Sequence, residues 1–253
     1  METKYPVLVH VPHSATYIPN EELQYFITSD LKRELLLMTD HHCDDLFTSE
    51  CEMICFPISR LVCDPERFRN DENEIMAQLG MSAVYTSCSD GSELKQVPMQ
   101  HKEEILTKYY DKHHQILEDA TEKILELHDK CLIIDGHSFH NMPLPYEINQ
   151  NRNRPDICIG MDDFHTPERI KNLIYDFFID KGYTVAFNQP FAGSLVPMRY
   201  FRQDKRVMSV MIEINRRLYM NDNGGKLKGK GYSQIKHCIG SVIKLLNSEL
   251  RKD

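Results

Sequence analysis

The sequence predicts an α/β fold in which a mixed, largely parallel sheet is flanked by helices. Two observations lead to this prediction. Short apolar runs recur along the 253-residue chain, and amphipathic stretches separate them. The runs are mostly continuous in apolar character, which is typical of strands that are covered on both faces. Strands of this kind that alternate with helices indicate a sheet whose strands are mainly parallel.

The predicted strands and helices follow one another along the whole chain. Apolar runs predict strands at 6–11, 52–58, 131–135, 156–160, 183–187 and 207–214. Helices are predicted at about 30–49, 102–128, 167–181 and 231–250. The clearest helix is 102–128, where apolar residues from Ile105 to Leu127 recur at steps of about 3.6 residues, with charges on the opposite face. We find no repeat and no low-complexity linker, so we expect a single domain over 1–253.

The composition is that of a globular protein and argues against several functional classes. Hydrophobic residues make up 41% of the chain and charged residues 27%, which is unlike a disordered protein. No apolar run is long enough to span a bilayer, and the N-terminus lacks the apolar core of a signal peptide, so we expect a cytoplasmic protein. The net charge is −8, and we interpret the basic cluster at 226–231 as a solvated loop, so we expect no nucleic-acid partner.

Ionisable side chains stand at the ends of three predicted strands. His13 follows the first strand, Asp135 and His137 end the third, and Glu213 closes the last. Ligands bind at the carboxyl edge of open α/β sheets, because loops and helix N-termini meet there. Imidazole and carboxylate groups are good Zn²⁺ ligands, so these residues predict a zinc site. The alternative is that each histidine only makes a hydrogen bond at its strand end.

The stretch MTDHHCDDLF at 38–47 offers a third ligand for the metal. Asp40 and Asp44 are four residues apart, so on one helix they would share a face, and one or both would point into the site. The same stretch is also compatible with the solvated start of a helix. We interpret His113 and His114, which fall within the amphipathic helix, as structural or exposed.

Seven motifs in this chain resemble the N-formylglutamate amidohydrolase family. They occur in the family's order and cover nearly the whole chain: VPHSATYIP (11–19), TDHHCDDLF (39–47), SRLVCDPERF (59–68), DGHS (135–138), PDICIG (155–160), FAGSLVP (191–197) and IEINRRLYM (212–220). The resemblance implies a zinc-dependent amidohydrolase with a phosphorylase/hydrolase-like fold related to the zinc carboxypeptidases. Such an enzyme splits N-formylglutamate into formate and glutamate at the end of histidine degradation.

The resemblance also implies roles for individual residues. His13 and His137 resemble the family's metal histidines, and the acidic ligand is either Asp40 or Asp44. Glu213 stands where carboxypeptidase-like enzymes place their general base. Two positions depart from the family's pattern: Ala15 replaces a common glycine, and Glu66 replaces an asparagine in the motif that ends on Arg67.

Amide hydrolysis by such an enzyme needs a cation for the oxyanion and donors for the substrate's carboxylates. Arg67 is our candidate for the oxyanion, ahead of Arg60 and Arg216. Guanidinium groups hold carboxylates by bidentate hydrogen bonds. The expected substrate is a small anionic N-acyl amino acid, and its predicted contacts are Ser14, Arg60, Ser138, Arg152, Arg154, Arg199 and Arg216.

Three questions stay open on the sequence alone. Asp135 is either a partner that orients a metal-bound imidazole or a turn former. The substrate is N-formylglutamate or another N-acyl amino acid or peptide. The third question is whether the chain is an enzyme or a metal-free protein of the same fold that binds a carboxylate metabolite. For any single loop arginine, the alternative to substrate binding is that the side chain is solvated on the surface.

Overall fold

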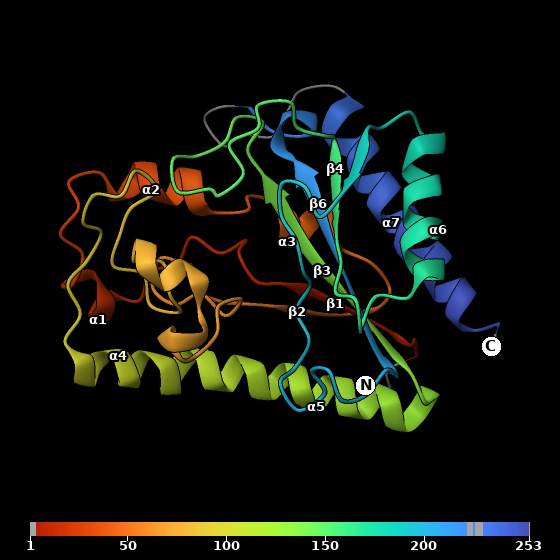
Figure 1. Cartoon of the computed structure of the whole chain (residues 1–253), viewed down its shortest axis with the longest axis horizontal. Coiled ribbons are helices and arrows are strands. Elements are labelled where there is room, and N and C mark those ends of the chain that lie inside the picture. The colour runs from red at the N-terminus through yellow and green to blue at the C-terminus, as the bar shows by residue number, and fades with distance from the viewer. Residues whose placement is uncertain (1–3, 222–224, 226–229, 253) are drawn as a thin grey trace.

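A mixed sheet forms the centre of the computed structural model, which describes residues 4–221, 225 and 230–252 (Figure 1). Within these residues the sheet has six strands in the order β2-β1-β3-β6-β4-β5. Their bounds are β1 (Val7–Val11), β2 (Glu52–Cys55), β3 (Cys131–Phe139), β4 (Ile157–Gly160), β5 (Val185–Phe187) and β6 (Val207–Asn215). β4 runs antiparallel to β6, whereas the other neighbouring pairs are parallel. The predicted α/β fold with a largely parallel sheet is therefore confirmed.

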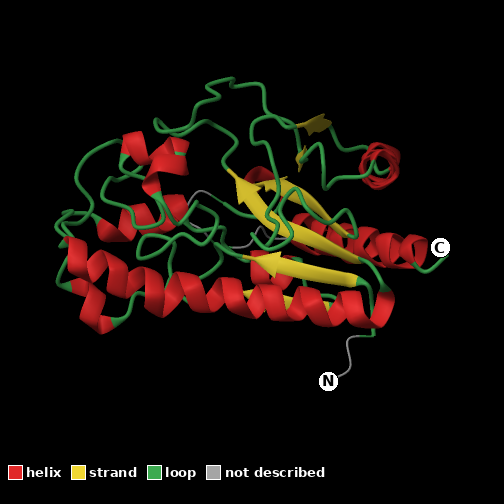
Figure 2. Ribbon diagram, turned by 60° about the horizontal axis from the view of Figure 1, so that its bottom comes forward, coloured by secondary structure: helices red, strands yellow, loops and turns green. Residues whose placement is uncertain are grey.

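Helices cover both faces of this sheet (Figures 1 and 2). The α-helices are α1 (Asn20–Leu23), α2 (Leu31–Met38), α3 (Cys43–Leu46), α4 (Met99–Ile105), α5 (Asp111–His128), α6 (Glu168–Asp180) and α7 (Lys230–Leu250). A π-helical segment, η3 (Leu106–Tyr110), joins α4 to α5, and the 3₁₀ turns are η1 (Asp71–Asn73), η2 (Ile75–Leu79) and η4 (Arg216–Leu218). α5 lies along one face of the sheet, and α6 and α7 lie along the other.

Alternation along the strands explains how the two faces are covered. Successive side chains of a strand point to opposite faces. Ile133 of β3 therefore packs in one core with Leu117 and Ile124 of α5. Its neighbour Ile134 packs in the other core, with residues of α6 and α7 such as Ile239. Because both faces are buried, the strands read as continuous apolar runs.

Two strands are longer than the sequence predicted. β3 does not end at Asp135 but continues to Phe139, and its whole length pairs in parallel with β6, which ends at Asn215. Asp135 is thus inside a strand and fully buried, which rules out a turn. Polar residues continue these strands because the backbone ladder persists beneath the side chains of the site.

The predicted helix at 30–49 is also wrong in its middle. α2 ends at Met38, Thr39 is extended with ψ of 135°, and His42 has a positive φ of 69°. A left-handed residue interrupts a helix, so α3 starts afresh at Cys43. Asp40 and Asp44 therefore do not share a helical face.

A glycine allows α3 to pack closely against the sheet at this point. A Cβ added to Gly136 would lie 2.9 Å from ring atoms of Phe47, which follows α3 and is fully buried. Contacts that close do not occur for real Cβ atoms, so the approach of Phe47 to β3 requires glycine. The packing fixes the turn that carries Asp40 next to the strand that carries His137.

Among the described residues, no helix is both long enough and apolar enough to cross a membrane. The basic cluster at 226–231 lies largely outside the described residues, so its interpretation as a solvated loop stays a prediction.

Candidate metal centre

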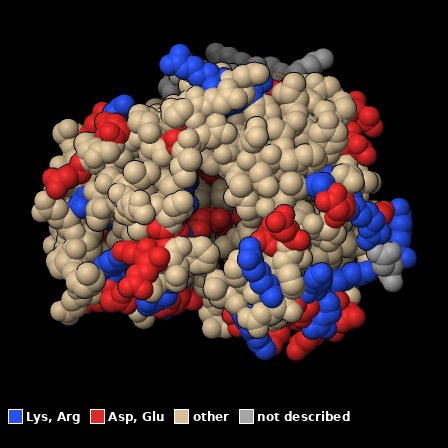
Figure 3. Space-filling model, viewed as in Figure 1, with Lys and Arg blue, Asp and Glu red and all other residues tan. Residues whose placement is uncertain are grey.

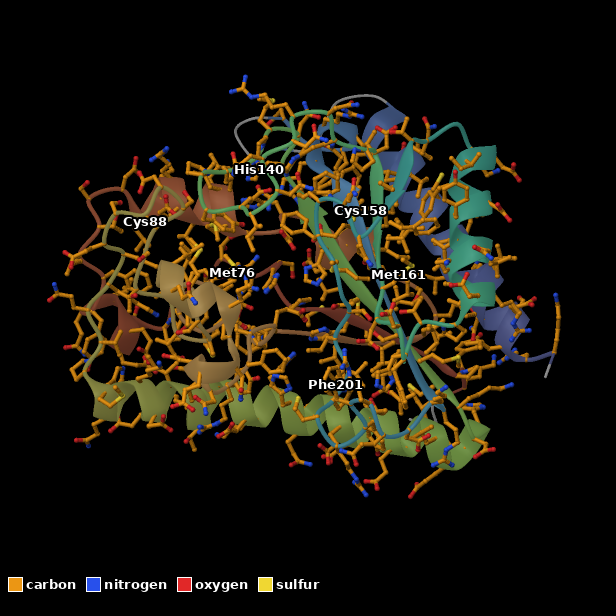
Figure 4. The ribbon with its side chains drawn as sticks, in the orientation of Figure 1. Met76, Cys88, His140, Cys158, Met161 and Phe201 are labelled. Carbon is orange, nitrogen blue, oxygen red and sulfur yellow. The ribbon has the colours of Figure 1, made fainter. Side chains whose placement is uncertain are left out.

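Cross-strand pairing brings the polar residues of three strands onto one face of the sheet. His10 of β1 is opposite Asp135 of β3, and His137 of β3 is opposite Glu213 of β6. Asp135 and His137 are two residues apart on β3, as are Ile133 and Asp135, so all three point to the face that α5 covers. Figure 3 shows a hollow in the molecule with Asp and Glu atoms at its floor. In Figure 4 the labelled Met76 lies to the left of this region, and Cys158 and Met161 lie to its right.

Two histidines and one aspartate form a compact buried group. His13 follows β1 by two residues, and the backbone N–H of Asp40 donates to the His13 carbonyl at 2.9 Å, which places the two side chains together. Asp40 Oδ2 lies 3.7 Å from His13 Nδ1 and 3.2 Å from His137 Nδ1. One ligand atom from each residue lies within 4.8 Å of the others, so the group could hold a metal ion.

Each of the three residues also contacts a partner through an atom that faces away from the other two residues. His13 Nε2 contacts Asp64 Oδ1 at 2.8 Å. Arg216 Nη2 donates to Asp40 Oδ1 at 2.9 Å. His137 Nε2 lies 3.2 Å from Asp135 Oδ1, although this nitrogen has no hydrogen bond of regular geometry. Outer carboxylate partners of this kind orient metal-binding imidazoles.

The inner atoms of the group lack partners or face one another, as metal ligands do. His13 Nδ1 is buried without a hydrogen bond, which is costly unless something binds it. Burial and the nearby Arg60 lower the pKa of His13, so its imidazole is neutral and can donate a lone pair. Burial alone would raise the pKa of Asp40, but the nearby His13 ring, the hydrogen bond with His137 and the charge of Arg216 hold it well below the usual range. The charge of Asp135 outweighs burial and raises the pKa of His137 well above its usual range, so a metal would have to displace a proton from this ring. Two imidazole nitrogens and a carboxylate oxygen then fit Zn²⁺.

The charges around the group also fit a divalent cation. Five buried or half-buried carboxylates surround it: Asp40, Asp64, Glu66, Asp135 and Glu213. Three guanidinium groups lie among them: Arg60, Arg67 and Arg216. Burial raises the pKa of Glu66 and of Glu213, so these two carboxyl groups favour the protonated form when no cation is near. When both ionise, two negative charges lack a counterpart in a site screened from water, and a dication would neutralise them.

Glu213 lies beside the group, and among the described residues it has no ion-pair partner. Its Oε2 is buried and makes no hydrogen bond, and burial raises its pKa to about 8. A salt bridge to one of the two arginines that follow β6 would give Glu213 a structural role, but both arginines pair with other carboxylates. Arg216 pairs with Asp40, and Arg217 pairs with Asp156 at 2.8 Å. A rigidly held carboxyl group that titrates near neutrality suits proton transfer.

Asp64 connects the metal group to two arginines. Its Oδ2 accepts from Arg60 Nη2 at 2.7 Å and from the Tyr85 hydroxyl at 2.6 Å, and Arg67 Nε lies 3.7 Å from it. The Nε atoms of Arg60 and Arg67 are buried without hydrogen bonds, so each guanidinium retains a free donor. The π-helical segment holds this loop in place, because the Tyr110 hydroxyl donates to the Arg67 carbonyl at 2.7 Å.

Comparison with known proteins decides the family. The model of the N-formylglutamate amidohydrolase family matches residues 5–220. The chain belongs to this family. Its activity class is therefore that of an amidohydrolase.

Solved structures support the fold of this family member. The crystal structure of N-formylglutamate amidohydrolase from Ralstonia eutropha JMP134 superposes with a TM-score of 0.83 at 22% identity, over 98% of this chain and 95% of that one. A gene product of Agrobacterium tumefaciens superposes with a TM-score of 0.66 at 17% identity, over 96% of this chain and 92% of that one. No curated protein matches in sequence.

The structure brings some of the family-based site residues together. His13, Asp40, His137, Glu213, Arg60, Arg67 and Arg216 surround the candidate metal group. Ser14 directly follows His13 and is half-buried, and the Ser138 hydroxyl accepts from Arg216 Nε at 3.2 Å. Arg216 also donates to the Leu37 carbonyl at 2.8 Å, so its donors serve Asp40 and the backbone rather than an open pocket.

Other predicted residues lie away from the group. Asp44 is exposed on α3. Arg199 is on the surface and pairs with Glu122 of α5 at 2.9 Å, and Arg152 is exposed in its loop. Arg154 is buried against Glu147 and lines a separate cavity of about 330 Å³. These loop arginines were predicted from charge alone, which does not specify where a loop folds.

Sequence reasoning missed three residues that structure the group. Asp64 was seen only as part of a motif, although a carboxylate between Arg60 and Arg67 is a signal of a charge cluster. His10 lies in the first strand on the same side as Leu8, so alternation could have placed it on the face of the site. His113, interpreted as structural or exposed, is buried, which agrees with the structural interpretation, but its contact with the His10 ring across the interface of α5 and the sheet was not foreseen.

Proposed function

We propose that this family member is a zinc-dependent amidohydrolase that acts on a small N-acyl amino acid, with N-formyl-L-glutamate as the first candidate and formate and glutamate as products. The observation that carries the proposal is the group of His13 Nδ1, His137 Nδ1 and Asp40 Oδ2, each with an outer partner, beside the unpaired carboxyl of Glu213.

His13, Asp40 and His137 would hold the zinc ion. When bound, zinc would supply Lewis-acid polarisation of the amide carbonyl and make water easier to deprotonate. Asp64, Arg216 and Asp135 would keep the three ligands in orientation through their outer atoms.

Glu213 would move the proton. Its carboxylate would take a proton from the attacking water and deliver it to the amide nitrogen as the bond to the acyl carbon breaks. Burial opposes the charged form of Glu213, while the neighbouring cations favour it, so its pKa lies where both halves of this transfer are possible at neutral pH.

Arg60 and Arg67 would bind the charges of the substrate. Their free Nε–H groups are available as donors to an oxyanion or to a substrate carboxylate. Glu66 adds a carboxylate in this neighbourhood, at 3.9 Å from His137, where the family commonly has asparagine. That difference favours testing substrates other than N-formylglutamate, such as N-acetyl or N-succinyl amino acids.

An activity screen of the zinc-loaded protein tests the proposal. N-formyl, N-acetyl and N-succinyl derivatives of glutamate, glutamine and aspartate would be compared by kcat/KM, with amine release as the readout. We expect hydrolysis of at least one compound and loss of turnover after chelation. A zinc-loaded, folded protein that cleaves none of them but binds N-formylglutamate would instead support the carboxylate-binding alternative.

A further inference from the structure

A second group of ionisable side chains, His10, Glu66 and Asp135, lies next to the metal group, and the proposed chemistry gives His10 no role. His10 Nδ1 lies 2.9 Å from Asp135 Oδ1 and 3.4 Å from Glu66 Oε1. Their ligand atoms lie within 4.8 Å of one another, so geometry alone would also allow a cation there. His10 and Asp135 are both fully buried.

The charges argue against a second cation at this place. One dication in the first group already neutralises the excess of five carboxylates over three guanidinium groups. A second dication would leave two uncompensated positive charges in a buried site, which is unfavourable. The distance between His10 Nδ1 and Asp135 Oδ1 is that of an ordinary hydrogen bond, so another role is required.

The hydrogen-bond donors and acceptors of this second group determine where its protons lie. A metal on His137 Nδ1 leaves the ring's only proton on Nε2, which faces Asp135. Ionised Asp135 can only accept, and its Oδ2 takes the Leu195 backbone N–H at 3.2 Å. The proton between His10 and Asp135 must therefore sit on His10 Nδ1.

The hydrogen-bonded chain continues from His10 to His113 of α5. His10 Nε2 lies 2.8 Å from His113 Nε2, so one of these two nitrogens carries a proton and the other accepts it. When the single proton of the His10 ring sits on Nδ1, Nε2 accepts, and His113 donates. Burial lowers the pKa of His113 to about 2, so its ring is neutral and bears that single proton on Nε2. The chain of contacts runs from the metal group to a helix on the outside of the sheet.

We infer that His10 is a positioning residue for the metal centre: its Nδ1–H holds Asp135, Asp135 orients His137, and His113 anchors the far side of the His10 ring. This inference rests on the proposed zinc function. It assigns His10 to metal retention through hydrogen-bond direction and not through metal ligation.

Two substitutions at His10 separate the two ends of its ring. Asparagine places an amide nitrogen near the position of Nδ1, so His10→Asn keeps a donor for Asp135 and loses His113. Glutamine reaches the position of Nε2, so His10→Gln keeps a partner for His113 and loses the donor to Asp135. Both residues are neutral and polar, and they differ in which end of the ring they replace.

Zinc release into excess chelator, followed with a coloured metal indicator, measures the effect. We expect His10→Gln to release zinc about 10–100-fold faster than the unsubstituted protein, and His10→Asn to stay within a few-fold of it. His165→Gln is the matched control, because His165 is another buried histidine whose Nδ1 bonds to the Val207 carbonyl, away from the metal group. Its substitution should leave zinc release unchanged.

Equal release from both His10 variants would overturn the inference, whether fast or slow. The inference would also be overturned if the unsubstituted protein held two zinc ions per chain and both variants lost one, because His10 would then be a ligand. If either variant fails to fold, ¹⁵N NMR of the zinc-loaded unsubstituted protein decides: a proton on His10 Nδ1 supports the inference, and a proton only on Nε2 overturns it. An unsubstituted protein that binds no zinc would overturn the proposed function itself, and the inference with it.

Discussion

At the scale of single residues, the candidate site depends on carboxyl groups that differ in what surrounds them. Asp64 accepts from an arginine and a tyrosine, and although burial alone would raise its pKa, the charge of Arg60 and the hydrogen bond with His13 hold it well below the usual range. Glu213 is equally buried but has no such donors, and its pKa rises. The same chemical group is thus fixed as an anion in one place and able to exchange a proton in the other.

Glu213→Gln tests the assigned proton transfer. The amide is nearly the same size and lies in a fully paired β6, so zinc content and Tm should stay close to those of the unsubstituted protein. Loss of proton transfer should lower kcat by about 10²–10⁴-fold with little change in KM. Loss of zinc together with activity would make Glu213 a ligand. Early melting with retained turnover would make it a structural residue.

Arg67→Lys tests the proposed role in binding the substrate or the oxyanion. Lysine keeps the charge but loses the planar fork and the free Nε–H, so kcat/KM should fall about tenfold or more. Arg199→Lys is the control, because Arg199 pairs with α5 carboxylates on the surface. Kinetics measured on the best substrate of the screen should change in the first variant only; equal kinetics for both would remove Arg67 from the site.

At the scale of secondary structure, the apolar strands were predictable and the polar ends were not. All six strand positions follow from apolar runs, because burial on both faces demands them. β3 continues beyond the predicted strand end at Asp135 and includes His137 and Ser138, which the sequence did not place in a strand. Their strand conformation comes from pairing with β6, a long-range contact that local sequence does not reveal.

The turn between α2 and α3 shows a second limit of local pattern. Helical spacing placed Asp40 and Asp44 on one face, but the extended Thr39 and left-handed His42 separate them. The backbone bond from Asp40 to His13 selects this conformation, and it joins residues far apart in the sequence. The strand ends predicted that His13 and His137 lie close together, whereas the position of Asp40 beside them required the tertiary contact.

Gly136→Ala tests the packing of α3 on β3. The added methyl group would meet the Phe47 ring at 2.9 Å, so the free energy of unfolding should fall by about 1–3 kcal/mol. Denaturant unfolding measures the change, and Gly240→Ala is the control because its Cβ meets nothing within 4 Å on α7. Phe47→Leu in the same chain should recover part of the loss, and strictly additive effects of the two substitutions would contradict the proposed contact.

At the scale of the whole molecule, the chain gathers five carboxyl groups and three guanidinium groups around one candidate metal group, and a bound cation would balance the excess. The carboxylates come from β3, β6 and the loops after α2 and β2, so every layer on that side of the sheet contributes to it. Their mutual repulsion opposes folding when no metal is present. Removal of the metal should therefore affect stability as well as activity.

The metal-free protein should become less stable as the pH rises above neutrality. Burial raises the pKa of Glu213 to about 8, so the folded protein keeps a proton that the unfolded chain has already lost. The charge of Asp135 outweighs burial and raises the pKa of His137 well above its usual range, which acts in the same direction. From about pH 7 to about pH 8 the Tm should fall, and this fall should be shallower in Glu213→Gln. Calorimetry that shows a rising Tm over this range, or an unchanged slope in the variant, would contradict the claim that the folded protein keeps Glu213 protonated near neutral pH.

Metal content per chain tests the account most directly. Elemental analysis of the purified protein should find one zinc ion per chain, and His13→Ala, His137→Ala and Asp40→Asn should each lose it. Asp44→Asn makes the same chemical change four residues away on the exposed side of α3, and it should retain zinc fully. Full zinc occupancy in His13→Ala and His137→Ala would contradict the metal centre. Loss of zinc in Asp44→Asn with retention in Asp40→Asn would show that Asp44, and not Asp40, is the carboxylate ligand.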